Sequence, residues 1–483
     1  MNPLALLLLV PIIGAILSAT PLKSGRFAGK ITIAASIAEL ILAAEIARLV
    51  LRFGTTTAAR GFLVADSLSV VIALLVAFVA FTASLFSYGY IAIHREAEDG
   101  ARRIRSYFVL YNLFVLSMLS APVLAHLTLV WVAIELTTLM SAYLVAYVDT
   151  AEALEAAWKY VILTSAGAII GLFGFLLLYW GTQAGGELPF TWEGLSQGAS
   201  HVPPAILWLG FLLCLVGFGT KVGLVPLHTW LPDAHSQAPA PVCALLSGIE
   251  TTTVLYVLMR LFPVLQASHV ANQSAWFCAV GLVSVGVAAF VLIRVHDYKR
   301  MFGASTVEQM GIIMVAVGLG GFPAHFAAVY QVAAHTLTKS LCFFAAGAVL
   351  ILTGTQEVAR VRGIMRRSPA TAVALLLGGL GIAGAPPFAV FISEFFIFRA
   401  AVFSKHYVVV GLLTLFVAIA FCAITFHITA MVFGSGGEFN GHKSPAICSL
   451  AIVIAFIPML VLGFYLPSSL QSLFEGAARA LGI

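Results

Sequence analysis

Long apolar stretches, separated by short polar loops, recur along the whole chain. A helix needs about 20 apolar residues to cross the hydrocarbon core of a bilayer, and the pattern predicts about 14 such segments. The predicted segments are 3–20, 28–52, 62–90, 105–124, 126–148, 158–181, 205–231, 237–262, 274–295, 300–320, 325–353, 370–402, 406–433 and 447–467. The sequence therefore predicts an all-α polytopic membrane protein with no separate soluble domain.

Composition supports this interpretation, because 61% of the residues are hydrophobic and only 9% are charged, far from the values of soluble domains. The first apolar run has no basic residue before it, whereas Lys23, Arg26 and Lys30 follow it. We therefore expect a retained first span rather than a signal peptide. The six cysteines are scattered without a CxxC pair, so we expect no cofactor in this chain, and any redox chemistry would belong to partner chains.

Basic residues in the loops predict the orientation in the membrane. About fifteen of the 25 Lys and Arg residues, among them Lys23, Arg95 and Lys299, follow odd-numbered segments, and about five follow even-numbered ones. Because Lys and Arg concentrate on the cytoplasmic side, both termini should lie on the outer, periplasmic side of a cell (inner) membrane. The same bias accounts for the formal net charge of +5 without a nucleic-acid partner.

Ionisable residues remain inside the predicted segments after the loop charges are subtracted. An ionisable side chain costs at least about 2.5 kcal/mol at the bilayer centre, and such residues face a bundle interior or a hydrated cavity. The set comprises Lys159, Lys221, Lys339, Glu39, Glu45, Glu135, Glu250, Glu308 and Glu394. Together they indicate a hydrated route for an ion through the membrane.

Within this set, Lys221 and Glu135 are the strongest functional candidates, because each stands in the middle of an otherwise apolar stretch. Glu39, Glu45 and Glu250 are more simply explained by pairing with Arg48, a backbone group or a neighbouring subunit. Burial destabilises a charged side chain and an opposite charge stabilises it. Movement of Glu135 toward or away from Lys221 would therefore hold or release a proton.

Two predicted segments contain helix breakers in their interior. The seventh includes Gly217, Gly223 and Pro226, and the twelfth includes four glycines before Pro386 and Pro387. Proline removes a helix hydrogen bond, and unwound backbone at membrane depth is tolerated only where it is buried in protein or lines a cavity. Both breaks thus indicate hydrated sites, although a packing kink is the simpler alternative for each.

The two breaks lie five segments apart, and a second correspondence has the same offset. Lys159 in the sixth segment and Lys339 in the eleventh are each followed eight residues later by glycine. An odd offset inverts the second copy, so segments 4–8 and 9–13 would form inverted five-helix repeats. The predicted division is 1–104, then the repeats 105–262 and 263–433, and a C-terminal part, 434–483.

Histidines add to the candidate relay, because imidazole titrates near neutral pH. His335 stands four residues before Lys339 on the same helix face, and His228 follows the break in the seventh segment. A histidine hydrogen-bonded to a backbone carbonyl is an equally good explanation for His335 and the better one for His427.

Several motifs resemble those of the antiporter-like membrane subunits of respiratory complex I, a family that also includes subunits of membrane-bound hydrogenases and multisubunit Na⁺/H⁺ antiporters. The motifs are residues 219–242, Trp131 to Glu135, 297–300, 305–311, His335 to Lys339 and 386–395. Among its groups, the hydrogenase-4 component F type is most similar. The resemblance implies a proton-translocating subunit in which Glu135 and Lys221 form the controlling pair, Lys339 with His335 continues the route, and Glu394 leads to the exit.

One position departs from the family pattern. Many relatives carry a further lysine where this chain has Thr252, and a threonine hydroxyl orders water but cannot hold a charge. The middle of the route would then depend on water wires or on Glu250, which puts a step-for-step copy of the complex I route in doubt.

Three functions remain open at this point. The first is the proton-translocating subunit of a complex I-like or hydrogenase-type redox complex, with other membrane subunits and peripheral redox subunits as partners and no catalytic centre of its own. The second is a subunit of a multisubunit cation (Na⁺)/proton antiporter. The third is the proton-coupled membrane subunit of an inorganic carbon uptake complex.

Overall fold

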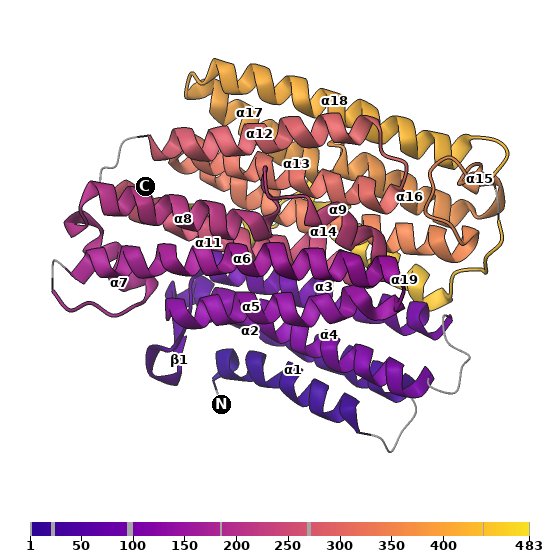
Figure 1. The fold of residues 1–483 in the computed structure, drawn as a ribbon, viewed down its shortest axis with the longest axis horizontal. Coiled ribbons are helices and arrows are strands. Elements are labelled where there is room, and N and C mark those ends of the chain that lie inside the picture. The colour runs from indigo at the N-terminus through magenta and orange to yellow at the C-terminus, as the bar shows by residue number, and fades with distance from the viewer. Residues whose placement is uncertain are drawn as a thin grey trace.

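The computed structural model describes residues 2–20, 25–93, 100–183, 186–267, 272–437 and 439–482. Within these ranges the chain is almost entirely helical, and most helices run side by side along the long axis of the molecule (Figure 1). The β-strands of the described residues, β1 (Thr56–Ala58) and β2 (Leu63–Ala65), pair as one antiparallel hairpin. Lys23 and Arg95, which entered the loop-charge count, lie outside the described residues.

Six long helices form the N-terminal part of the described chain. They are α1 (Pro3–Ala19), α2 (Gly25–Phe53), α3 (Ser67–Ile93), α4 (Gly100–Val123), α5 (Leu127–Val145) and α6 (Ala151–Thr182), with the 3-10 turns η1 (Ala59–Gly61) and η2 (Ala146–Val148). Local sequence sets several of the starts. Asn2 accepts a hydrogen bond from the Leu4 N–H, and Thr150 accepts one from the Ala153 N–H, as N-cap residues do.

The middle of the chain contains the first interrupted helix. Its elements are α7 (Trp192–Gly198), η4 (Ala199–His201), α8 (Pro204–Val222), α9 (Trp230–Gln237), α10 (Ala240–Leu245), η5 (Leu246–Glu250) and α11 (Thr251–Ala267). Element η5 is a π-helical turn that continues α10 into α11. Such turns carry one extra residue and occur frequently at functional sites.

The rest of the described chain contains the second interrupted helix. Its elements are α12 (Gln273–Ile293), α13 (Tyr298–Leu319), α14 (Gly321–Thr353), α15 (Ile364–Arg367), α16 (Pro369–Ile382), α17 (Ala389–Phe403), α18 (Tyr407–Phe433), α19 (Ala446–Phe464) and α20 (Ser468–Ala480).

Both predicted breaks are present, and both helices end in the same way. The Leu224 N–H bonds to the Gly219 carbonyl at 2.8 Å, and the Ala385 N–H bonds to the Leu380 carbonyl at 2.9 Å. These six-to-one hydrogen bonds close a helix with a left-handed residue, here Gly223 (φ 87°) and Gly384 (φ 79°). Glycine adopts that conformation without steric cost, and the prolines that follow prevent the helix from continuing.

By length and composition, eleven helices of the described residues can cross a membrane. The prediction of an all-α polytopic membrane protein is confirmed. The number of about 14 spans stays a prediction, since α1 and α16 are shorter apolar helices and α2 carries several charges.

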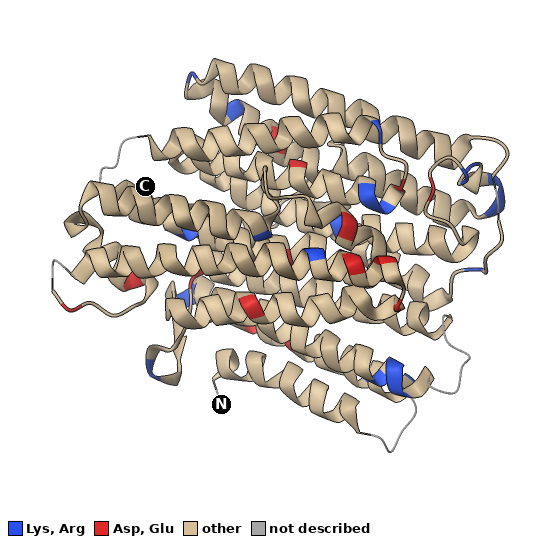
Figure 2. Ribbon diagram, viewed as in Figure 1, with Lys and Arg blue, Asp and Glu red and all other residues tan. Residues whose placement is uncertain are grey.

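The most deeply buried helices of the bundle carry ionisable residues. The apolar windows of Ala240–Ala267 and α13 are 100% buried and that of α14 is 94% buried, whereas that of α18 is 22% buried. Figure 2 shows charged positions scattered across the middle of a mostly neutral ribbon. Charges on the innermost helices must be compensated by protein groups or water, because lipid cannot solvate them.

Candidate functional site: a buried line of lysine, glutamate and histidine

Lys221 is the best-enclosed cation of the first half. It lies in the last turn of α8, directly before the break, and its side chain is 1% exposed. Its Nζ donates hydrogen bonds to the Ile134 carbonyl at 2.8 Å and to the Thr138 hydroxyl, both on α5. Nζ also lies 3.2 Å from Glu250 Oε1. Lys221 therefore has a buried carboxylate as its direct counter-ion.

Glu250 is the acceptor at the centre of this cluster. Besides Lys221, its Oε1 accepts hydrogen bonds from the Thr137 hydroxyl at 2.8 Å and the Tyr160 hydroxyl at 2.7 Å. The Tyr160 and Ser141 hydroxyls lie 2.7 Å apart. The other carboxylate oxygen, Oε2, is buried and has no partner among the described residues. A carboxylate with one saturated and one vacant oxygen can accept a proton or a water molecule.

Glu135 lies on α5, the helix whose Ile134 and Thr138 hold Lys221. It makes no ion pair with Lys221, and its Oε2 accepts a hydrogen bond from the Ser165 hydroxyl at 3.0 Å, while Oε1 is buried without a partner. The observed ion-pair partner of Lys221 is Glu250, and a place for Glu250 on the route stays a prediction. A controlling role for Glu135 stays a prediction.

Lys339 is the buried cation of the second half, on α14. Its Nζ donates to the Phe302 carbonyl and to the Ser305 hydroxyl, each at 2.5 Å. It forms no ion pair with a described residue. His335, one turn earlier, lies with Nε2 3.1 Å from the Ser247 carbonyl, and its Nδ1 is buried without a partner. The hydrogen bonds of Lys339 Nζ thus go to neutral groups, and Glu308 acts on its charge without forming an ion pair.

Glu308 and Glu394 lie beyond Lys339, on α13 and α17. Glu308 is 2% exposed and its Oε2 has no partner. Glu394 Oε1 accepts a hydrogen bond from Gln309 Nε2 at 3.3 Å, and Gln309 Oε1 accepts one from Gln331 Nε2 at 2.5 Å. These side chains extend the polar line toward the second break.

The second break leaves space for the Glu394 carboxylate. A Cβ atom at Gly384 would lie 2.5 Å from Glu394 Oε2, closer than such atoms can approach. Glycine is therefore required here both for its positive φ and for the room that it leaves.

The π-helical turn Leu246–Glu250 contacts α13 and α14. The Ser247 and Thr306 hydroxyls lie 2.5 Å apart, and the Thr336 hydroxyl donates to the Gly248 carbonyl at 2.8 Å. Thr252 is buried and donates to the Gly248 carbonyl of its own helix at 2.9 Å. Half-buried His228 lies in the first break with an unpartnered Nδ1. Hydroxyl groups therefore stand between the two lysine clusters.

Two residues expected inside the bundle lie on its outer surface. The Lys159 side chain is 50% exposed and pairs with Glu155 at 2.6 Å and Asp233 at 3.5 Å. Glu45 is 40% exposed and pairs with Arg48 at 2.6 Å. The expectation that both face the bundle interior is wrong, because hydropathy averaged over a helix does not say which face a side chain occupies. The pairing of Glu45 with Arg48, which the sequence favoured, is confirmed. Glu39, by contrast, is buried with both carboxylate oxygens unpartnered.

Sequence reasoning missed two buried basic residues. Lys299 was counted as a loop charge, but it is 1% exposed and donates to the Ser236 and Ala238 carbonyls at 2.8 and 2.6 Å. His235 is fully buried, and neither ring nitrogen has a partner. The signal was present, since both residues belong to the motifs 219–242 and 297–300. The part of the chain that the structure describes holds no group of three or more metal-ligating side chains.

Comparison with known proteins identifies the class of protein that this fold and site define. Residues 125–420 match the family model described as NADH:quinone oxidoreductase/Mrp antiporter, TM. The chain belongs to this family of antiporter-like membrane subunits, which confirms the resemblance seen in the motifs.

Particular relatives refine the assignment. The chain is 36% identical over 423 residues to a "Hydrogenase-4 component F homolog" of Methylacidiphilum infernorum, covering 86% of this chain and 87% of the relative. It is 28% identical to one Na⁺/H⁺ antiporter subunit of Alkalihalophilus pseudofirmus, covering 86% of this chain but 54% of that longer protein.

Among solved structures, a chain of the membrane-bound sulfane sulfur reductase, an archaeal respiratory membrane complex, superposes with a TM-score of 0.88. The alignment covers 100% of this chain and 98% of the other at 24% identity. That likeness supports the fold.

Proposed function

We propose that this chain carries protons across the membrane along the buried line from Lys221 to Glu394, as a membrane subunit of a multisubunit redox complex. The observation that carries the proposal is the Lys221–Glu250 ion pair, 3.2 Å apart and at most 1% exposed, at the end of an interrupted helix. A buried ion pair is weak evidence for stability, because replacing it by apolar groups is often neutral or stabilising. A proton-carrying role explains the presence of a buried ion pair at this position.

The elementary step is a change in the distance between the two charges. With Glu250 alongside, the Lys221 ammonium is stabilised and holds its proton. If Glu250 moves away or becomes protonated, the ammonium loses its counter-ion and releases the proton. Lys221 is also held by Ile134 and Thr138 of α5, the helix that carries Glu135. A shift of α5 would therefore alter both contacts, which gives Glu135 a means of control.

The proton then passes into the second half through hydroxyls and water. Ser247, Thr306 and His335 lie between the lysine clusters, and Lys339 receives the charge among neutral groups. Glu308 and Glu394 complete the route toward the second break. Water at the entrance would be ordered by His228 at the first break and by Lys159 with Asp233 at the surface. Water in the middle of the route would be ordered by Thr252 on α11.

The arrangement is consistent with the inverted repeats 105–262 and 263–433, flanked by 1–104 and 434–483. In this division Glu135 on α5 and Glu308 on α13 would occupy corresponding helices of the two copies, and each copy would contain one break. The copies differ chemically, because Lys159 is half exposed while its counterpart Lys339 is buried. We place both termini on the outer side of the cell membrane from the loop charges.

Partner subunits would supply the driving force. A redox complex is favoured over the other two functions by the relative named as a hydrogenase-4 component. It is also favoured by the respiratory complex that contains a chain of the same fold. Exchange of Na⁺ is the second candidate, favoured by the relative named as part of an Na⁺/H⁺ antiporter. Coupling to inorganic carbon uptake rests on family resemblance alone and would be revealed by the proteins that co-purify.

The test is proton uptake into vesicles that contain the native complex isolated through this chain, with partner turnover recorded in the same sample. Lys221→Ala should abolish proton uptake, whereas Lys405→Ala, at an exposed lysine in the loop after α17, should leave it unchanged. Uptake that needs Na⁺ and stops in its absence would favour cation exchange. Undiminished uptake in Lys221→Ala would refute the relay.

A further inference from the structure

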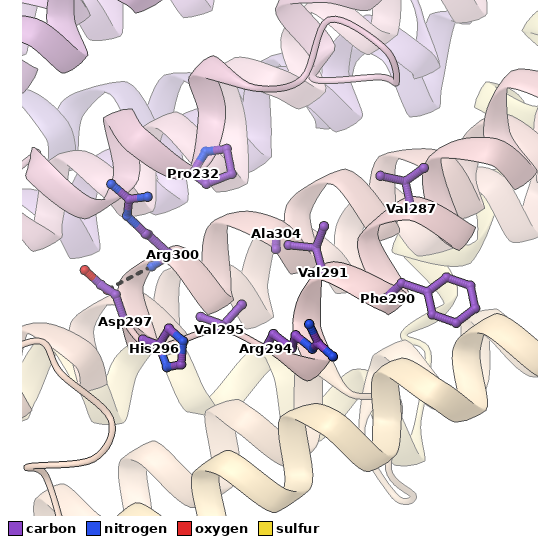
Figure 3. Close-up of a pocket in the computed structure, with 10 residues that line it drawn as sticks. All are labelled: Pro232, Val287, Phe290, Val291, Arg294, Val295, His296, Asp297, Arg300 and Ala304. Atoms are coloured by element: carbon purple, nitrogen blue, oxygen red, sulfur yellow. Dashed lines mark hydrogen bonds between the residues drawn. The ribbon is translucent and has the colours of Figure 1, made fainter.

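A groove of about 820 Å³ opens on the surface between α9, α12 and the start of α13. Figure 3 shows its wall along α12, where Val287, Phe290 and Val291 succeed one another toward Arg294. Phe290 and Val291 are 57% and 44% exposed. They belong to α12, a candidate membrane span. The wall is therefore apolar, concave and on the outer surface of the described bundle.

The groove ends at a group of basic side chains where α12 stops. Arg294 and His296 line this end from the loop that joins α12 to α13, and Arg300 lines it from the first turn of α13 (Figure 3). Arg294 and His296 are exposed, and neither side chain has an ion-pair partner among the described residues. Arg300 lies 3.0 Å from Asp233 Oδ1. At least one arginine is thus free to bind an anion.

The acidic groups at the same end are already engaged. Asp297 Oδ1 accepts the backbone N–H groups of Lys299 and Arg300 at 2.7 and 3.0 Å, and its Oδ2 accepts the Ser236 hydroxyl at 2.8 Å. Asp233 is bound by Arg300 and Lys159. The unbalanced charge that the groove presents is therefore positive.

We propose that this groove binds one anionic phospholipid, with an acyl chain along α12 and its phosphate at Arg294. Residues 287 to 294 span two turns, roughly 10 Å, so the apolar wall leads from the basic end into the depth of the hydrocarbon. Basic pockets between membrane helices bind anionic headgroups, and arginine binds phosphate through two parallel hydrogen bonds. Charge and position together favour a lipid over an apolar protein surface.

The experiment is native mass spectrometry of the complex isolated through this chain, after incubation with phosphatidylglycerol or with phosphatidylcholine of the same acyl chains. Wild type should retain phosphatidylglycerol preferentially, and Arg294→Gln should lower that retention about fivefold, the effect of one basic residue at an anionic lipid surface. Arg367→Gln, at an exposed arginine of α15, is the matched control and should retain wild-type binding. Glycerol phosphate should not compete, because it lacks the acyl chain.

A second measurement keeps the proposal testable if Arg294→Gln fails to assemble. A photo-crosslinking residue placed at Val287 should form a lipid adduct in the intact complex. Equal loss of lipid in Arg294→Gln and Arg367→Gln, equal retention of the two lipids, or a protein adduct at Val287 would each overturn the proposal. None of these readouts depends on proton movement, so the lipid site and the relay can fail independently.

Discussion

The two buried lysines of this chain are solvated in opposite ways. Lys221 has a carboxylate 3.2 Å away and a tyrosine and two threonines around the pair, whereas Lys339 has a carbonyl, a hydroxyl and no ion-pair partner among the described residues. The first arrangement holds an ammonium firmly. The second leaves a charged lysine poorly compensated, since neutral dipoles stabilise it less than a carboxylate does. We infer that Lys221 stores the proton and Lys339 passes it on.

The largest effect is expected when the pair in the first half is broken. Lys221→Ala leaves Glu250 as an unpaired buried charge and should cost about 3 to 5 kcal/mol of stability. Lys221→Ala combined with Glu250→Gln should recover much of that loss, because no charge remains. Thermal unfolding of the purified complex measures both variants. Additive destabilisation would show that the two side chains are not coupled.

Removal of the second lysine should be less damaging to stability and equally damaging to transport. Lys339→Met leaves only a carbonyl and a hydroxyl without their donor, a loss of about 1 to 3 kcal/mol, yet it interrupts the route. We expect proton uptake into vesicles to fall at least about tenfold while the complex assembles. If Lys339→Met were as unstable as Lys221→Ala, the proposed difference between the two lysine sites would be wrong.

A smaller effect is expected from the hydroxyls around Glu250. Tyr160→Phe removes a 2.7 Å hydrogen bond to its Oε1 and should cost about 1.5 kcal/mol, the lower value for a bond to a charged group. Thermal unfolding measures the loss. Tyr143→Phe, at a tyrosine 65% exposed, is the control, and an equal effect of the two changes would mean that the bond contributes nothing.

The smallest effect concerns an ion pair outside the route. Asp66 lies just before α3, 2.5 Å from Arg260. Burial by itself raises the pKa of this carboxyl, but the charge and hydrogen bonds of Arg260 outweigh it and hold the pKa below its usual value.

A lowered pKa means that the Asp66 contribution is present at neutral pH and is lost as the pH falls below the usual aspartate value of about 3.9. Asn keeps an oxygen that can accept the Arg260 hydrogen bond and the pair is partly exposed, so Asp66→Asn should cost only about 1 kcal/mol at pH 7, and the difference from wild type should shrink in acid. Unfolding measured across that range checks the sign. A difference that grows in acid would mean that Asp66 is not held ionised by Arg260.

Much of this architecture follows from the sequence. The apolar runs predict the helices, the Gly and Pro clusters predict both breaks, and the charges inside apolar runs select Lys221 and Lys339. The choice of counter-ion could not be predicted, because the π-helical turn Leu246–Glu250 carries an extra residue. That residue rotates later side chains by roughly 100° relative to a regular α-helix.

The burial of side chains near helix ends could not be predicted from the sequence either. Lys299 stands one residue inside α13, where hydropathy cannot tell a solvated loop from a covered one. Its burial depends on carbonyls contributed by residues about 60 positions away in the chain.

Proton uptake in Glu250→Gln and Glu135→Gln, measured side by side in vesicles containing the native complex, tests the central claim most directly. Glutamine keeps the shape and removes the charge, so Glu250→Gln should reduce proton uptake per partner turnover at least about tenfold with assembly intact. Wild-type uptake in Glu250→Gln would contradict the account and reduce the Lys221–Glu250 pair to a structural contact.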